Sequence, residues 1–413
     1  MTTKDWKTLA CILGIHFLMW MALGPSTPST DDLCYLQDAM KVSDGSYTFN
    51  ASPKTQRLGM ILPTFGLTSI FGMHPFVITL YPLFCSLLSI VMVFGWLRHL
   101  PTMAVVASLL LALNITQITY SCALFPDVIL SMMMFGLVLA FQLRHDQRPW
   151  LALLGGSMLV AGFFVKQLIV VIIPWLAYWL IKDLLNGHNR RFHLVFASTI
   201  IIAGGSVWTA VYLHTGDWLF LIASVEEQHN RVFADLDATA LLERLTWQPL
   251  FFLNKLTGFW PLLLLALPTL MQKITNISVN LARQYFLYLF IFFWVGSTSL
   301  QSYAPLLLLD RMWLPMLIPL CILAANTLTV NLKFGSKKSM ALLFTAFALS
   351  SFIALNRSSE GEAMFYLLVP ICLYLGHKMD QRERGDGLVA VTITLPFLLL
   401  AVWFVVSNSV YLH

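Results

Sequence analysis

Two adjacent carboxylates, Asp31 and Asp32, follow the first long apolar run of the sequence, and Tyr35 follows Asp31 at the spacing of one helical turn. Ser29 or Thr30 can cap a short helix here, which places both carboxylates in its first turn. The helix dipole and the free N–H groups of that turn favour the ionised form. An ionised aspartate can serve as a base or hold a divalent cation. An ordinary capped helix at a membrane interface accounts for the same pattern equally well.

Arg57 and Asp127 have the residue types that complement such a carboxylate pair. A guanidinium can grip a phosphate through paired hydrogen bonds, and Gly59, two residues after Arg57, lets another backbone or a ligand come close. Asp127 opens an apolar run just after Pro126, where a carboxylate is costly unless it is paired, hydrated or ligating. The structural alternatives are an arginine on lipid head groups and a simple helix-start acid.

Lys166 and Arg311 each lie at the edge of an apolar run. Lys166 has no acidic neighbour in the sequence, so its partner must come from elsewhere in the fold or be an anionic ligand. Asp310 could neutralise Arg311. For both cations, extension of the charged end to the membrane interface is the alternative interpretation.

A later stretch of the sequence carries a second group of charges. His229 and the Glu226-Glu227 pair could shape a pocket, although a solvated loop explains them as well. Asp235-Leu236-Asp237 matches the short D-x-D pattern of soluble nucleotide-sugar transferases, but a three-residue match has almost no specificity. Gly-rich phosphate loops and the H-E-x-x-H motif are absent from the sequence.

The elements that must position these residues are membrane-spanning helices. Of the 413 residues, 58% are hydrophobic and only 11% are charged, and the mean hydropathy is +0.76. Soluble domains carry about 25% charged residues. Unbroken apolar runs favour helices over a β-barrel, whose strands would alternate apolar and polar residues. The basic residues are scattered between these runs, which excludes a nucleic-acid partner, and the six cysteines lack metal-ligand spacing.

The apolar runs predict one all-α polytopic transmembrane bundle of about 13 spans, a single domain over residues 1–413 with no soluble C-terminal domain. A cytoplasmic N-terminus puts most of the basic residues inside. The chemistry-bearing residues then share the outer face, with interfacial helices in a first outer loop of about 25–74 and a further outer loop of about 214–248. Cleavage of the first segment as a signal peptide is the alternative to its being the first span. The predicted spans are 8–24, 75–97, 101–122, 125–143, 149–165, 167–184, 193–213, 249–271, 284–304, 312–332, 339–356, 363–377 and 388–408.

Taken in order, these motifs resemble the GT-C superfamily of membrane glycosyltransferases, in particular the branch with the aminoarabinose transferase of lipid A and the protein O-mannosyltransferases. Each motif is short, and their order, spacing and common outer placement carry the resemblance. One departure is the acidic pair, which is Asp-Asp here and Asp-Glu in that branch. The matching motifs are Asp31-Asp32-x-x-Tyr35-x-x-x-Ala39, Arg57-x-Gly59-x-x-x-Pro63, Phe125-Pro126-Asp127, Lys166, and Arg311 with Pro315.

The resemblance implies an inverting transfer of a hexose or pentose from a polyprenyl-phosphate donor to an acceptor hydroxyl or amine. Because no soluble acceptor-binding domain is expected, we expect the acceptor to be a lipid-linked or cell-envelope glycan. It implies that Asp31 or Asp32 takes the acceptor proton and that Asp127 is the second acid. A divalent metal, Mg or Mn, held by Asp32 and Asp127 is one possibility. The residues implied to bind substrate, together with the pocket candidate His229, are Tyr35, Arg57, Lys166 and Arg311.

Two other functions fit a protein of this kind. A transporter or flippase of lipid-linked sugars would need polar residues near the bilayer midplane and commonly has repeated halves, which the sequence lacks. A surface-polysaccharide polymerase or ligase would depend chiefly on the outer loop at 214–248. Membrane lipids are partners in every case, and the favoured location is the bacterial inner membrane with the active site on its outer face.

Overall fold

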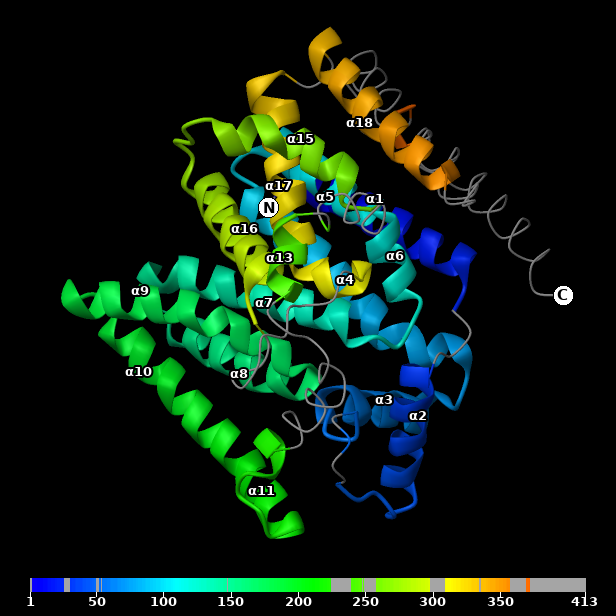
Figure 1. Cartoon of the computed structure of the whole chain (residues 1–413), viewed down its shortest axis with the longest axis vertical. Helices are drawn as coiled ribbons and strands as arrows, with labels where there is room; N and C mark the ends of the chain where they lie inside the picture. The colour runs from blue at the N-terminus through cyan, green and yellow to red at the C-terminus, as the bar shows by residue number, and fades with distance from the viewer. Residues whose placement is uncertain are drawn as a thin grey trace, which may run out of the picture.

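The computed structural model describes residues 2–25, 30–49, 52, 54–146, 148–223, 239–246, 248, 258–297, 309–333, 336–356 and 369–371. All the secondary-structure elements that these residues form are helices. The predicted all-α polytopic membrane bundle is therefore confirmed (Figure 1).

The N-terminal part of the bundle runs from α1 to α7. Its helices are α1 (Thr3–Leu23), α2 (Thr30–Ser43), α3 (Leu58–Phe71), α4 (Pro75–Leu97), α5 (Pro101–Ala112), α6 (Ile115–Ser121) and α7 (Pro126–Gln142). The remaining helices are η1 (Leu143–Asp146), α8 (Pro149–Val165), η2 (Gln167–Ile172), α9 (Ile173–Leu185), α10 (Arg190–Thr199), η3 (Ile200–Gly204), α11 (Gly205–Thr215), α13 (Thr239–Leu245), α15 (Trp260–Met271), α16 (Ile277–Val295), η4 (Asp310–Met316), α17 (Leu317–Asn326), η5 (Thr327–Asn331) and α18 (Lys337–Asn356).

The described residues contain seven helices that are long and apolar enough to cross a membrane, or eight if the bent pair α5–α6 counts as one span. The predicted count of about 13 is not reached within this described part of the chain. Two of the predicted spans, 149–165 and 249–271, correspond to the shorter apolar helices α8 and α15. The predicted spans 363–377 and 388–408 lie almost wholly outside the described residues.

The predicted span 101–122 is broken, with a bend of 56° between α5 and α6. Asn114 is the reason, because its side chain caps α6 by accepting a hydrogen bond from the Gln117 N–H and donates another to the carbonyl of Gly258. His16 of α1 contacts the Ala112 carbonyl at the break, with 2.8 Å between its Nδ1 and the oxygen. An apolar run alone does not reveal such a break.

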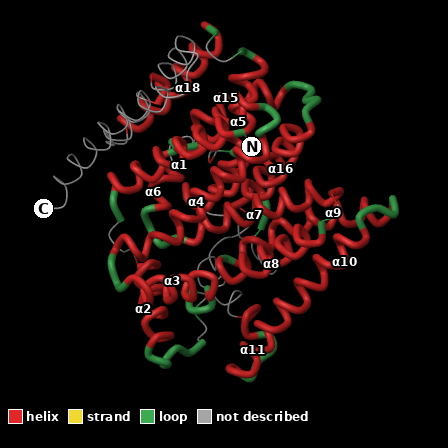
Figure 2. The backbone as a smooth tube through the Cα atoms, turned by 180° about the vertical axis from the view of Figure 1, so that it is seen from behind, coloured by secondary structure: helices red, strands yellow, loops and turns green. Residues whose placement is uncertain are grey.

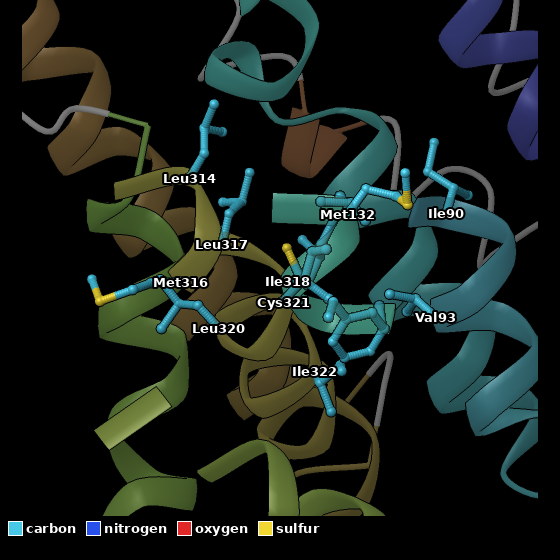
Figure 3. Close-up of a cluster of buried hydrophobic side chains, with 14 of the residues drawn as sticks. Ile90, Val93, Met132, Leu314, Met316, Leu317, Ile318, Leu320, Cys321 and Ile322 are labelled. Atoms are coloured by element: carbon cyan, nitrogen blue, oxygen red, sulfur yellow. The ribbon is translucent and has the colours of Figure 1, made fainter. Parts of the chain in front are cut away.

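The hydrophobic core joins the late helices to the early ones. Figure 3 shows a cluster of buried side chains in which Leu314 of η4 and Ile318 of α17 gather with Val93 of α4 and Met132 of α7. Ser131 of α7 donates a hydrogen bond to the Leu314 carbonyl at 3.0 Å. The core thereby fixes η4, the element that carries Arg311, against the start of α7.

Helices α2 and α3 pack against each other at one end of the molecule (Figures 1 and 2). Helix α3 also packs against α8, and the two backbones are close at Gly59, since a Cβ there would lie 2.8 Å from the Val165 backbone nitrogen. Gly59 was expected to let another backbone or a ligand come close, and the structure places the backbone of α8 there. Phe49 and Leu58 of the same region pack with Phe164 at the end of α8.

Candidate active site

A buried ion pair joins the start of α7 to the end of α8. The Lys166 ammonium donates to Asp127 Oδ1 at 2.6 Å, and these residues are 8% and 1% exposed. As predicted, Asp127 lies in the first turn of α7 after Pro126, and Lys166 lies between two apolar helices. Lys166 also lies 3.0 Å from Met312 Sδ of η4. The predicted distant partner of Lys166 is therefore Asp127, 39 residues earlier.

The predicted short helix after the first span is α2, and its first turn contains Asp31 and Asp32. The Asp31 carboxylate lies between two cations. Its Oδ1 is 2.5 Å from Lys54 Nζ, and its Oδ2 is 3.4 Å from Arg311 Nη1. Asp32 is buried, with 4% of its surface exposed. The two adjacent acids thus have different environments, one open to solvent and cations and the other enclosed.

The electrostatics of the site keep Asp31 ionised. Partial burial raises the pKa of this carboxyl, but the Lys54 ammonium, assisted by Arg311 and Arg57, outweighs it and holds the pKa below the ordinary value of 3.8. Asp31 therefore carries its negative charge at neutral pH.

Arg57 is held on the face of Tyr35, one turn along α2 from Asp31. The guanidinium donates a hydrogen bond to the Tyr35 hydroxyl, and its Cζ lies 5.7 Å from the ring centroid. Burial raises the pKa of Tyr35 to about 12, so the hydroxyl stays neutral. The Nε of Arg57 is buried and has no hydrogen-bond partner among the residues that the structure describes, and a ligand oxygen is the kind of group that satisfies such a donor.

Arg311 of η4 contacts the start of α7. Its guanidinium stacks over the ring of Phe125, at 4.5 Å from Cζ to the centroid. Phe125 is the N-cap residue of α7, two residues before Asp127. The charges of both Arg57 and Arg311 also act on the Lys166 ammonium, so the cations form one electrostatic group.

The structure thus brings together seven of the eight residues predicted for the site from segments more than 250 residues apart; they are Asp31, Asp32, Tyr35, Arg57, Asp127, Lys166 and Arg311. The eighth, His229, lies outside the described residues, as do Glu226, Glu227, Asp235, Asp237 and the side chain of Asp310. The contacts add Lys54, Phe125 and Met312, to which the sequence analysis assigned no role. Lys54 was visible only as one charge in a loop, and no local pattern indicates its partner.

The predicted metal site at Asp32 and Asp127 fits the described side chains poorly. Among the residues that the structure describes, no three His, Cys, Asp or Glu side chains converge. Asp127 Oδ1 already accepts from an ammonium, which a divalent cation would have to displace.

This arrangement suits a reaction in which a phosphate leaves. An ionised carboxylate lies among guanidinium and ammonium groups that can stabilise negative charge as it develops. A carboxylate at the edge of such a group can accept a proton from an attacking hydroxyl. The site offers both functions within one group of side chains, and neither requires a covalent nucleophile.

Part of the chain, including two residues of the site, matches the model of a known protein family. Residues 64–210 match the model of the family described as dolichyl-phosphate-mannose-protein mannosyltransferase. That segment runs from α3 to α11 and includes Asp127 and Lys166. No curated protein sequence matches the chain.

Solved structures share the fold over nearly the whole chain. The crystal structure of ArnT from Cupriavidus metallidurans bound to undecaprenyl phosphate has a TM-score of 0.66 at 15% identity, covering 98% of this chain and 77% of that one. The same protein in the apo state gives 0.58 at 14% identity, with 95% and 75% covered. The cryo-EM structure of the arabinosyltransferase EmbB from Mycobacterium smegmatis gives 0.52 at 16% identity, with 98% and 40% covered. The resemblance to GT-C membrane glycosyltransferases expected from the sequence is thereby confirmed.

Proposed function

We propose that this chain, a multi-pass membrane protein that resembles the glycosyltransferases just described, transfers a sugar from a polyprenyl-phosphate donor to a lipid-linked or cell-envelope glycan. The observation that carries the proposal is the convergence of Asp31 and Asp127 with the cations Arg57, Lys166 and Arg311. These five residues come from α2, the N-terminus of α3, α7, the α8–η2 junction and η4. The similar ArnT structure contains undecaprenyl phosphate, which is the class of lipid phosphate that we propose for the donor here.

The proposed reaction is a single displacement with inversion. An acceptor hydroxyl oxygen forms a bond to the anomeric carbon of the donor sugar, and the bond between that carbon and the phosphate oxygen breaks. The electron pair of the broken bond stays on the polyprenyl phosphate, and the hydroxyl proton passes to a carboxylate. Arg57, Lys166 and Arg311 stabilise the departing phosphate.

We assign the proton-accepting role to Asp31 in preference to Asp32. Asp31 retains 22% exposure of its side chain, so an acceptor can reach it, whereas Asp32 is almost fully enclosed. Asp127, ion-paired to Lys166, has a positioning role, because its carboxylate orients the ammonium towards the phosphate. A bacterial inner membrane with this site on its outer face is the proposed location.

The test is sugar transfer by the purified protein from a panel of polyprenyl-phosphate hexoses and pentoses to extracted glycolipids. Asp31→Asn should reduce the rate by about 100-fold or more, because general-base catalysis contributes about 10²–10⁴-fold. Asp44→Asn, which removes an exposed carboxylate from the same outer loop, is the matched control and should retain the rate. Melting temperatures in detergent would establish that each variant is folded.

Two results would contradict the proposal. Absence of transfer across the panel, with movement of lipid-linked sugars in vesicles that Asp31→Asn preserves, would indicate a flippase. Transfer that depends on residues 214–248 and tolerates Asp31→Asn would indicate a polymerase or ligase of surface polysaccharide.

A further inference from the structure

The Asp31 carboxylate occupies a position that suits a phosphate. Each of its oxygens meets a different cation, Lys54 Nζ at 2.5 Å on Oδ1 and Arg311 Nη1 at 3.4 Å on Oδ2. The two cations come from the first outer loop and from η4, so they approach from separate parts of the chain. An anion with two or more oxygens between an ammonium and a guanidinium is the arrangement in which proteins hold phosphate groups.

This position is accessible, unlike the neighbouring ion pair. The side chains of Lys54, Asp31 and Arg311 are 28%, 22% and 23% exposed. Those of Lys166 and Asp127 are only 10% and 2% exposed. A ligand from outside can therefore compete for the cations of Asp31 far more readily than for Lys166.

The four cations of the site differ in whether they contact Asp31. Lys166 is paired with Asp127, and Arg57 donates to the neutral hydroxyl of Tyr35. Lys54 and Arg311 both contact the one carboxylate to which we assign the proton-accepting role. While they hold it, Asp31 is a weak base, consistent with the lowered pKa of its carboxyl.

We propose that Asp31 stands in for the donor phosphate in the unloaded protein, and that Lys54 is a further ligand of that phosphate. This inference rests on the proposed function. Binding of the donor moves Lys54 and Arg311 from the carboxylate to the phosphate, and the released Asp31 then faces the acceptor as a stronger base. Donor binding therefore precedes proton transfer, and the unloaded site does not present an activated base to water.

Binding of undecaprenyl phosphate to the full-length protein in detergent, measured by native mass spectrometry, tests the exchange without requiring transfer. Asp31→Asn removes the competing anion and should lower Kd by about 10-fold, which corresponds to the weakest of the measured close charge pairs. Lys54→Met removes a proposed ligand of the phosphate and should therefore raise Kd by about 10-fold. Asp44→Asn removes the same charge from an exposed position of the same loop and should leave Kd within about twofold of the wild type.

The results of this experiment distinguish failure of the exchange at Asp31 from failure of the proposed function. If the wild type binds undecaprenyl phosphate and Asp31→Asn binds it no more tightly, the exchange is wrong while the proposed function stands. If no folded variant binds it, the proposed function fails and the exchange with it. If Asp31→Ala reproduces the tighter binding of Asp31→Asn, the effect comes from the lost carboxylate.

Two competitors distinguish the donor phosphate from other anions. Excess inorganic phosphate in the buffer and excess phosphatidylglycerol in the micelle should each leave the bound fraction of undecaprenyl phosphate unchanged. Displacement by either one would show that Lys54 and Arg311 hold anions in general, which would overturn their assignment to the donor.

Discussion

Gly59 shows how one residue positions the cations of the site. It lies two residues after Arg57, where α3 meets the end of α8 just before Lys166. A Cβ at this position would come within 2.6 Å of Val165 Cγ2 and 2.8 Å of Val165 N. The second of these atoms is backbone and cannot rotate away, so α3 and α8 would have to separate.

We predict that Gly59→Ala destabilises the protein by about 1–3 kcal/mol, as overpacking does elsewhere. It should also weaken binding of undecaprenyl phosphate, because Arg57 and Lys166 move apart. The measurements are the melting temperature in detergent and the Kd for the lipid. Gly66→Ala in the same helix is the matched control, since no atom lies within 4 Å of its added Cβ. An equal loss of stability in both variants would contradict the packing explanation.

At the scale of elements, a second buried ion pair fastens α9 to the end of α7. Arg144 of η1 donates to both oxygens of Asp183 in α9, at 2.5 Å from Nε and 3.1 Å from Nη2. Asp183 Oδ2 also lies 2.9 Å from Nε2 of His193 in α10 and accepts from Asn189 at 2.9 Å. The Arg144 guanidinium stacks on the Trp179 ring at 4.6 Å. One carboxylate thereby joins three helical elements away from the candidate site.

We predict that Asp183→Asn destabilises the protein by about 3–5 kcal/mol, because it leaves the Arg144 guanidinium buried without its counter-charge. The double variant Arg144→Met/Asp183→Leu should recover most of the loss. Asp146→Asn is the control, since Asp146 forms an exposed pair with Arg148 at 4.0 Å, and this substitution should not change the melting temperature. A melting temperature that Asp183→Asn leaves unchanged would mean that this pair contributes little.

At the scale of the whole molecule, the distribution of basic residues predicts which face of the bundle is outside. The site lies with α2 and α3, which pack together at one end of the molecule, and α1 before them packs into the core through Leu9, Ile12 and Ile15. A cytoplasmic start of α1 therefore puts α2 and its carboxylates on the outer face.

This orientation predicts opposite labelling of two exposed positions by a membrane-impermeant thiol reagent. Asp44→Cys should react in intact cells, whereas His188→Cys, between α9 and α10, should react only after permeabilisation. Cys11 and Cys34, which are partly exposed, would be replaced by serine first, as would Cys372, which lies outside the described residues; Cys85, Cys122 and Cys321 are buried. Reaction of His188→Cys in intact cells would reverse the topology and move the candidate site to the cytoplasm.

The local features of the site could be predicted from the sequence. Helix caps and first-turn acids depend on a few neighbouring residues, which is why α2 with Asp31 and α7 with Asp127 begin where the sequence predicts. The membrane bundle follows from apolar runs, a property of composition. The break at Asn114 was missed because it depends on distant partners, namely His16 and the Gly258 carbonyl.

The sequence by itself determined a helical membrane protein with a set of acids and cations at the ends of its apolar runs. Only the tertiary structure decided which of them meet: Lys166 with Asp127, and Asp31 between Lys54 and Arg311. The physical reason is that a carboxylate pairs with whichever cation helix packing brings within a few ångströms of it. That distance depends on how α3, α7, α8 and η4 cross, and the spacing of the residues along the chain does not predict it.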